Sequence, residues 1–385
     1  MPKSPNLSNI FTKIGVSKFG IKRRIWLLLF YPAAFLLCFL TAKHPTLAEL
    51  YAKSVYFDLS LAVNRLTRLA PFSVAELLLG VLLLGAVVYI VLFILFLCKG
   101  KKPRSVLVVK FITNILCFFG VIYFLFALGC GINYNRYTFA QTSGLIILPS
   151  TKTELTDLCT SLAGDVNRLR GKEKTDKSSV TKLRDKNFSA TAEEARKSFD
   201  RLSSDYPLLK SGYGAPKPVL LSGLMSRCNI TGIFVPFTFE ANVNTGAPAY
   251  TLPATMCHEL SHLRGYMRED EANFIGYLAC LKSDDPDFQY SGSMLAFTYA
   301  SNALYAADPQ AASGIYAKLS DGVRKDLTYN SNYWKQFEGP VAAVSNSVND
   351  RYLRANSQKD GVQSYGRMVD LLLARQKELT RTQKK

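Results

Sequence analysis

Two of the three histidines in the chain lie four residues apart around a glutamate, in the segment His258-Glu259-Leu260-Ser261-His262. On a helix, His258 and His262 share one face, so both imidazoles can bind one metal ion. Glu259 lies one position further on, where its carboxylate can reach a metal-bound water instead of the metal. Zn²⁺ lowers the pKa of such a water, and Glu259 would take its proton and later pass it to the leaving amine. The spacing predicts a zinc peptidase site with Glu259 as the catalytic base.

An acidic cluster follows these histidines and offers the third metal ligand. Glu269 and Glu271 are two positions apart, so a helix points them to nearly opposite sides. Glu269 shares its face with small or compact residues that let a second helix pack closely: Ala272, Asn273, Gly276 and Cys280. We therefore expect His258, His262 and Glu269 as the ligands, with Glu271 as the alternative. Asn273 is a candidate partner for one imidazole, although an ordinary polar role on the helix is as compatible with its position.

The surrounding sequence gives the metal-binding helix a start, an end and a neighbour. The run Thr251-Leu252-Pro253 is typical of a helix start, and Gly265 is placed to end the helix. A strand-like segment at 233–244 comes before it, and Pro236 within that segment favours an edge position. An edge strand beside the metal would let an extended peptide add to the sheet. The alternative is an exposed helix on which the histidine pair is incidental.

A peptidase also needs a hydrogen-bond donor for the oxyanion of its tetrahedral intermediate. The later helices offer Tyr299, Tyr365 and Arg367. For each of them, a role in packing or in a salt bridge is the competing interpretation. The sequence alone does not choose among the three.

The site region resembles known metallopeptidases. The histidine motif followed by Glu269 and Asn273 looks like the gluzincin pattern, and it resembles membrane metallopeptidases of the HtpX and CAAX-protease kind and the antirepressor-cleaving metallopeptidases. More closely, the run CHELSHLRGYMREDEANFIGYLAC resembles a bacterial family of membrane proteins catalogued only as a domain of unknown function. That family shares three N-terminal spans, a run like 131–136 after the third span, and a tail like 352–370. The resemblance covers nearly the whole chain and implies a zinc peptidase.

Three long apolar segments occupy the first third of the chain, at about 25–42, 77–98 and 106–131. Each is long enough to cross roughly 30 Å of hydrocarbon as a helix. Because no small-x-small cleavage site follows the first segment, we interpret it as a retained anchor and not as a signal peptide. Residues 1–131 are therefore expected to form a membrane anchor in the lipid bilayer.

Positive charge predicts how the anchor is oriented. Residues 1–24 and 99–110 are rich in Lys and Arg, so both should be cytoplasmic, whereas the less basic 44–74 should lie outside. With three spans, everything after about residue 132 would then be extracytoplasmic. We expect a multi-pass protein of the plasma membrane.

The remaining composition argues against two other classes of site. The formal charge is +18, from 47 Lys and Arg against 29 Asp and Glu. Many of these bases flank the apolar spans, and no DNA- or RNA-binding pattern is present, so nucleic acid is not an expected partner. None of the eight cysteines forms a CxxC pair, which argues against a cysteine-based metal or redox site.

The polar two-thirds is expected to be α+β and mostly helical. Residues 132–205 are predicted to form a helical connecting region, because apolar residues recur there at helical spacing. Residues 206–385 are predicted to form a zincin-like domain, with strands at 218–222 and 233–244 and helices from Pro253 onward.

Together these features predict a membrane-anchored zinc endopeptidase that hydrolyses peptide bonds through a Glu-activated, zinc-bound water. Its substrate would be a peptide or a membrane-proximal protein segment. The alternative function is a membrane sensor or scaffold that keeps Zn²⁺ for stability and does not cleave. Glu259 argues against that alternative, because a structural zinc site needs no base.

Overall fold

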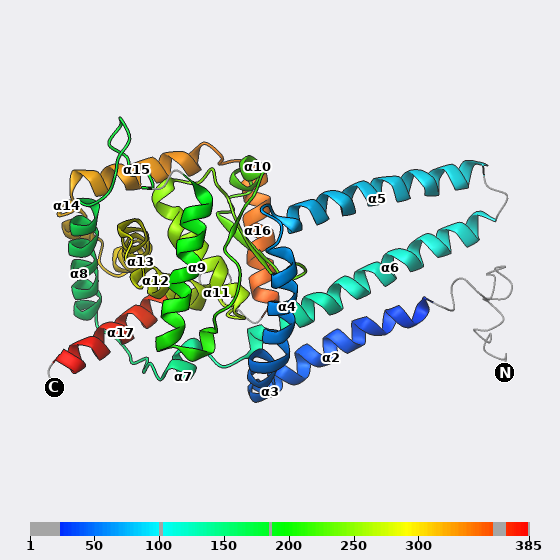
Figure 1. Cartoon of the computed structure of the whole chain (residues 1–385), viewed down its shortest axis with the longest axis horizontal. Helices are drawn as coiled ribbons and strands as arrows, with labels where there is room; N and C mark the ends of the chain where they lie inside the picture. The colour runs from blue at the N-terminus through cyan, green and yellow to red at the C-terminus, as the bar shows by residue number, and fades with distance from the viewer. Residues whose placement is uncertain (1–23, 100–102, 185–186, 357–366, 384–385) are drawn as a thin grey trace.

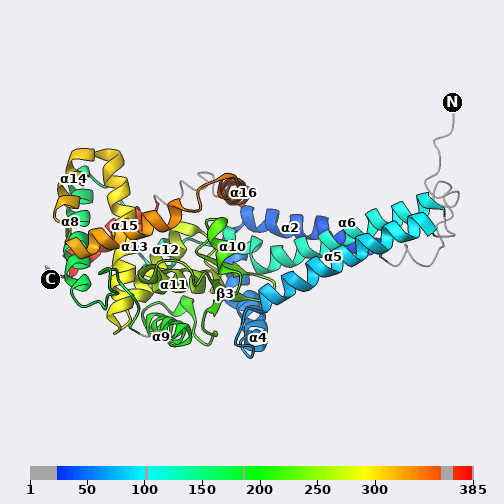
Figure 2. The same cartoon turned by 90° about the horizontal axis from the view of Figure 1, so that it is seen from above.

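The computed structural model describes residues 24–99, 103–184, 187–356 and 367–383. Three long helices project together from one end of a helical body (Figure 1 and Figure 2). They are α2 (Phe30–Lys43), which continues a 3-10 turn at Ile25–Leu29, α5 (Val74–Lys99) and α6 (Arg104–Gly129).

These three helices are candidate membrane spans, and their number agrees with the sequence prediction. Each is long and apolar enough to cross a membrane. Their large apolar side chains are mostly exposed, and α5 buries none of its residues. Apolar surface of this extent is typical of helices that contact lipid. The third helix ends at Gly129, two residues before the predicted end, because a 3-10 turn at Gly131–Asn135 follows it.

The segment between the first two spans folds onto the body. It comprises α3 (Pro45–Tyr51), a π-helical turn at Ala52–Tyr56 and α4 (Phe57–Thr67). Glu49 of α3 forms a buried ion pair with Arg136, with Arg136 Nε 3.0 Å from Glu49 Oε2. Tyr56 is fully buried within the main apolar core. This segment and the body therefore share one core.

The body is mostly helical, as predicted. Its helices surround a core in which α9, α11, α12 and α13 contribute many of the buried apolar side chains. The helices in chain order are α7 (Phe139–Ser143), α8 (Lys152–Arg170), α9 (Phe188–Asp205), α10 (Ser222–Arg227), α11 (Leu252–Leu263), α12 (Glu269–Leu281), α13 (Pro286–Ala307), α14 (Pro309–Ala317), α15 (Asp321–Lys335), α16 (Pro340–Ala355) and α17 (Arg367–Gln383).

Within the predicted connecting region 132–205, the longest elements are the helices α8 and α9. The apolar residues of α8 that recur at helical spacing are buried: Leu158, Leu162, Val166 and Leu169. Thr151 begins α8 with a capping box, in which its hydroxyl accepts from the Glu154 amide and the Glu154 carboxylate accepts from the Thr151 amide. This explains the sharp start of the helix.

A small three-stranded sheet lies between the spans and α11. Its strands are β1 (Lys217–Pro218), β2 (Gly232–Val235) and β3 (Glu240–Val243), in the order β1-β3-β2. β1 is parallel to β3, and β2 is antiparallel to β3, with Phe234 opposite Ala241. β2 is therefore an edge strand, as the sequence predicted for the segment that contains Pro236.

The strand predicted at 218–222 is wrong over most of its length. Only its first residue belongs to β1, and α10 begins at Ser222. The amides of Leu220 and Leu221 donate to the carboxylate of Glu76 instead of to β3. A carboxylate from the start of α5 thus ends the strand early.

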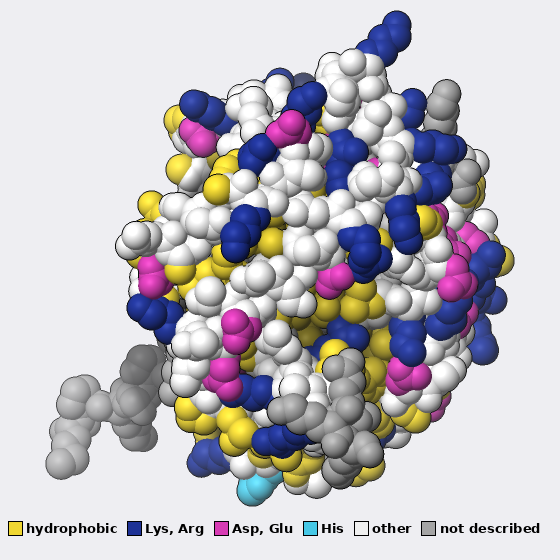
Figure 3. Space-filling model, turned by 90° about the vertical axis from the view of Figure 1, so that its left-hand side faces the viewer, with side chains coloured by type: hydrophobic (Ala, Val, Ile, Leu, Met, Phe, Trp, Pro, Cys, Tyr) yellow, Lys and Arg dark blue, Asp and Glu magenta, His cyan; other side chains and the backbone are white. Residues whose placement is uncertain are grey.

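The face of the body opposite the spans carries Lys and Arg side chains scattered among neutral and acidic ones (Figure 3). They do not gather into a single basic stripe on this face.

Candidate metal centre

Three side chains with metal-binding atoms converge between α11 and α12. His258 Nε2 lies 3.0 Å from His262 Nε2, and Glu269 places Oε2 3.3 Å from the first and Oε1 3.5 Å from the second. One donor atom from each of the three lies within 4.8 Å of the others. Among the described residues, this is the group of His, Cys, Asp and Glu side chains that could hold a metal ion. Two imidazoles and a carboxylate suit a zinc ion that keeps one open position.

The chain between the two helices brings Glu269 back to the histidines. α11 begins with Pro253 in its first turn and ends before Gly265, whose φ of +83° is the left-handed conformation that glycine adopts easily. The amide of Tyr266 donates to the carbonyl of Ser261, which closes the helix end. The chain then reverses, and Glu269 is the first residue of α12.

Close packing of α12 on α11 depends on Gly276. A Cβ built on Gly276 would lie 3.1 Å from the backbone nitrogen of His258. A larger residue there would push the two helices apart. The small face that the sequence assigns to Glu269 therefore does lie against the helix that carries the histidines.

The other ring nitrogen of each histidine has a partner that orients the ring. His262 Nδ1 lies 2.8 Å from the carbonyl oxygen of Tyr266, which only accepts hydrogen bonds, so Nδ1 carries the proton and a neutral ring leaves Nε2 with a lone pair. His258 Nδ1 lies 2.9 Å from Asn273 Oδ1, which has the same effect. Asn273 Nδ2 in turn donates to the hydroxyl of Tyr299 at 3.2 Å.

Lone pairs from both imidazoles and a carboxylate therefore face one point. Burial lowers the pKa of His262, but the nearby Glu269 carboxylate outweighs this and raises it to about 9. Burial alone would raise the pKa of Glu269, and the two histidines hold it well below its usual range. Both shifts have one cause, the attraction between the Glu269 carboxylate and the imidazoles. The donor set itself, two imidazole nitrogens and one carboxylate, fits a zinc ion.

Glu259 lies beside this centre and forms no ion pair with any residue that the structure describes. It is 3% exposed, and its Oε2 has no hydrogen-bond partner. The carboxylate accepts from the backbone amide of Phe234 in the edge strand β2, while burial raises its pKa. A Cβ built on Gly232 would lie 2.6 Å from Glu259 Oε1, so a larger residue at this position would force the strand or the carboxylate to move. A buried carboxylate with a raised pKa is suited to proton transfer.

Glu271, the alternative third ligand, lies elsewhere. Its Oε1 accepts from the amide of Phe139 at 2.7 Å and lies 3.3 Å from Arg268 Nη1. Burial raises the pKa of Glu271 to about 7. The structure thus uses Glu271 to hold the start of α7 and brings Glu269, not Glu271, to the histidines.

The three candidate oxyanion donors have different positions. Tyr299 reaches the centre through Asn273, and the charge of Glu269 adds to the effect of burial in raising its pKa. Arg367 is exposed at the start of α17. Burial raises the pKa of Asp270, and the positive charge of Arg367 partly offsets that rise. Tyr365 lies outside the described residues.

Sequence reasoning did not assign two other tyrosines that lie close to Glu269. Tyr134 donates to the hydroxyl of Tyr352 at 3.1 Å, and the Tyr352 hydroxyl lies 3.4 Å from Cys130 Sγ. Burial is the main cause that raises the pKa of both tyrosines, and the negative charge of Glu269 raises the pKa further. The two tyrosines are far apart in the chain, so no local pattern predicts that they meet. The one indication in the sequence is that both lie in runs shared with the resembled family.

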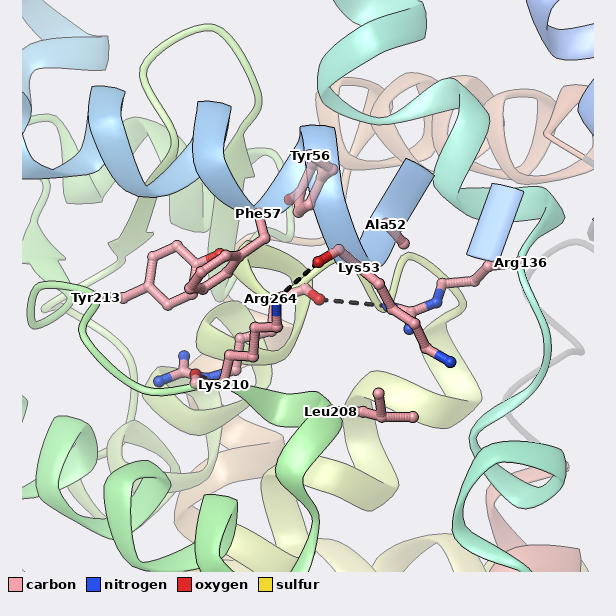
Figure 4. Close-up of a pocket in the computed structure, with 9 residues that line it drawn as sticks. All are labelled: Ala52, Lys53, Tyr56, Phe57, Arg136, Leu208, Lys210, Tyr213 and Arg264. Atoms are coloured by element: carbon pink, nitrogen blue, oxygen red, sulfur yellow. Dashed lines mark hydrogen bonds between the residues drawn. The ribbon is translucent and has the colours of Figure 1, made fainter. Parts of the chain in front are cut away.

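A small cavity lies behind the end of α11 and shows how the anchor supports the site (Figure 4). The hydroxyl of Tyr56 donates to the carbonyls of His262 and Leu263 at 3.3 and 3.2 Å. Arg136 donates to the carbonyls of Arg264 and Gly265, both at 3.4 Å. The cavity holds about 10 Å³, room for roughly one water molecule. Its residues therefore brace the C-terminal end of α11, and the cavity is too small for a substrate.

Comparison with known proteins identifies a family for most of the chain. The family described as "Protein of unknown function (DUF3810)" matches residues 51–373, from α3 to α17. No curated protein and no solved structure gives a match. The chain belongs to the DUF3810 family.

Proposed function

We propose that this protein is a membrane-anchored zinc endopeptidase. The observation that carries the proposal is the position of Glu259. Its buried carboxylate lies beside His258, His262 and Glu269, is oriented by the amide of Phe234 and has an oxygen without a partner. A zinc site that served stability alone would have no use for a second, uncoordinated carboxylate at this place.

The chain's own residues supply the proton transfers. His258, His262 and Glu269 would hold zinc, which when bound acts as a Lewis acid on water and on the substrate carbonyl. Glu259 would take a proton from the attacking water and give it to the leaving amine. Burial raises the pKa of Glu259 and so brings that pKa closer to the value that both proton transfers need. Tyr299 and the Tyr134–Tyr352 pair, all of which feel the charge of Glu269, are candidates to stabilise the oxyanion.

The edge strand offers a place for the peptide. The amide of Phe234 donates to Glu259 and not to β3, so this side of β2 faces the proposed catalytic base. An extended substrate that pairs with β2 would pass directly beside Glu259. The peptidase domain would lie outside the plasma membrane if the charge bias sets the orientation.

Metal removal tests this function. The purified full-length chain should bind one zinc ion per chain and degrade an unstructured protein such as β-casein, and a chelator should abolish the degradation. His258→Ala and Glu269→Ala should lose both zinc and activity. Glu271→Ala is the matched control and should keep zinc. Full activity after chelation, or full zinc content in both ligand variants, would refute the site.

A further inference from the structure

The sheet that carries β2 is attached to the ends of two membrane spans. At α5, the Glu240 carboxylate accepts from the amides of Val74 and Ala75 at 3.2 and 2.7 Å. At α6, a Cβ built on Gly129 would lie 2.7 Å from the carbonyl oxygen of Pro236, so the backbone after β2 rests directly on the last residue of that helix. The edge strand therefore has one end at the membrane anchor.

The other end of β2 lies at the proposed catalytic base. Gly232 touches Glu259, and Pro236, four residues later, touches Gly129. At about 3.3 Å per strand residue, these two contacts are roughly 13 Å apart along the chain. A peptide paired with β2 would thus run between Glu259 and the end of the third span within a few residues.

The surface around the end of α5 also suits contact with lipid. Glu76 in the first turn of α5 accepts from the amides of Leu220 and Leu221 at 2.9 and 2.8 Å, which places the start of α10 beside this span (Figure 1). Six large apolar side chains near this end are exposed by 45% or more. We call them the apolar collar: Leu66, Leu69, Phe72, Leu220, Leu221 and Leu224.

The collar is continuous with the span itself. Phe72 precedes the first residue of α5 by two positions. The exposed cations Arg65 and Arg68 lie at the end of α4, shortly before it in the chain. Apolar side chains flanked by Arg are typical of surfaces that enter the interface of a bilayer. The occupant of this surface is therefore the leaflet into which the spans enter, and the body rests on the membrane with β2 close to it.

We propose that the substrate is the juxtamembrane segment of another membrane-anchored protein, cut within roughly ten residues of its span, a length set by the short path along β2. This inference rests on the proposed peptidase function. It adds that the enzyme selects the bond to cut by its distance from the membrane more than by the residues around it. A substrate held in the same bilayer also gains the high effective concentration of a tethered reactant.

Reporter proteins with one span test this inference. Each carries ten randomised residues next to the span, and the same ten residues are also placed on a soluble carrier. Zinc-loaded full-length enzyme and reporter are reconstituted in the same phosphatidylcholine liposomes, and mass spectrometry maps the cuts. We expect at least tenfold faster cleavage of the anchored reporter. When ten Gly and Ser residues are inserted after the span, the cut should move into the insert.

The other outcomes separate the two proposals. Equal cleavage of the soluble carrier, or a cut that follows the randomised residues after the insertion, overturns this inference and leaves the peptidase function intact. Cleavage of neither reporter, together with intact β-casein, overturns both. Glu259→Gln in the same liposomes controls for a contaminating protease.

Discussion

Gly232 and Glu259 are in direct contact across the gap between β2 and α11, where a Cβ on the glycine would lie 2.6 Å from Glu259 Oε1. A separation below 3.0 Å forces one of the two to move. This one contact thus positions both the strand that would bind the substrate and the carboxylate that would activate water.

Gly232→Ala should therefore reduce peptide hydrolysis by about 100-fold, because a displacement of about 1 Å in a catalytic group has an effect of that size. Zinc content should stay unchanged, since no metal ligand moves. Gly223→Ala in α10 is the matched control, because a Cβ there meets nothing within 4 Å. Wild-type activity in Gly232→Ala would contradict this role of the contact.

Asn273 should matter for metal affinity, because it orients His258 through Nδ1. We expect Asn273→Ala to weaken zinc binding by about 10- to 100-fold, as loss of such a partner commonly does. Competition with a fluorescent zinc chelator measures the change. Asn302→Ala, at an exposed position on α13, should bind zinc like the wild type. Unchanged affinity in Asn273→Ala would remove this residue from the site.

A pH effect on stability should arise far from the metal. Burial raises the pKa of Glu173 to about 8, the neighbouring carboxylates of Asp287 and Asp285 add to the shift, and Arg184 opposes it. The folded state therefore holds the proton more tightly than the unfolded state, whose Glu pKa is about 4.3. The stability that Glu173 contributes is complete below that value and is lost as pH rises through about 8.

The test compares thermal unfolding of the wild type and Glu173→Gln at pH 5 and pH 9. Other groups titrate in both proteins, so the difference between them isolates Glu173. The wild type should lose more stability than the variant between the two pH values. An equal loss in both proteins would show that Glu173 is not protonated in the fold.

The apolar collar should contact lipid. Leu69→Trp places a tryptophan at a side chain that is 79% exposed. Its fluorescence should be quenched by brominated phospholipids in liposomes, beyond the quenching of the native tryptophans in the wild type. Tyr316→Trp on α14, at the end of the body away from the spans, should show no added quenching. Equal quenching at both positions would contradict the proposed placement of the body.

The parts of the site that the sequence predicts are those set by local geometry. The spacing of His258 and His262 on one helix turn, and the helix end at Gly265, depend on a few neighbouring residues. The choice of Glu269 over Glu271 also followed from helix periodicity. The three spans were predictable because hydropathy over about twenty residues is a strong signal.

The features that the sequence did not predict depend on contacts between distant segments. Tyr352 meets Tyr134 across 218 positions of the chain. The segment of α3 and α4 packs on the body through Glu49 and Arg136, which no local pattern links. The strand predicted at 218–222 failed because Glu76, far along the chain, binds the amides that would have extended it.

The most direct test of the central claim is to replace Glu259 by Gln and to measure zinc content and peptide hydrolysis on the same purified sample. Gln keeps the shape of the side chain but cannot take the proton. We predict one zinc ion per chain, as in the wild type, with hydrolysis reduced by at least about 100-fold. Hydrolysis at the wild-type rate by the zinc-loaded variant would contradict the role of Glu259 as the catalytic base.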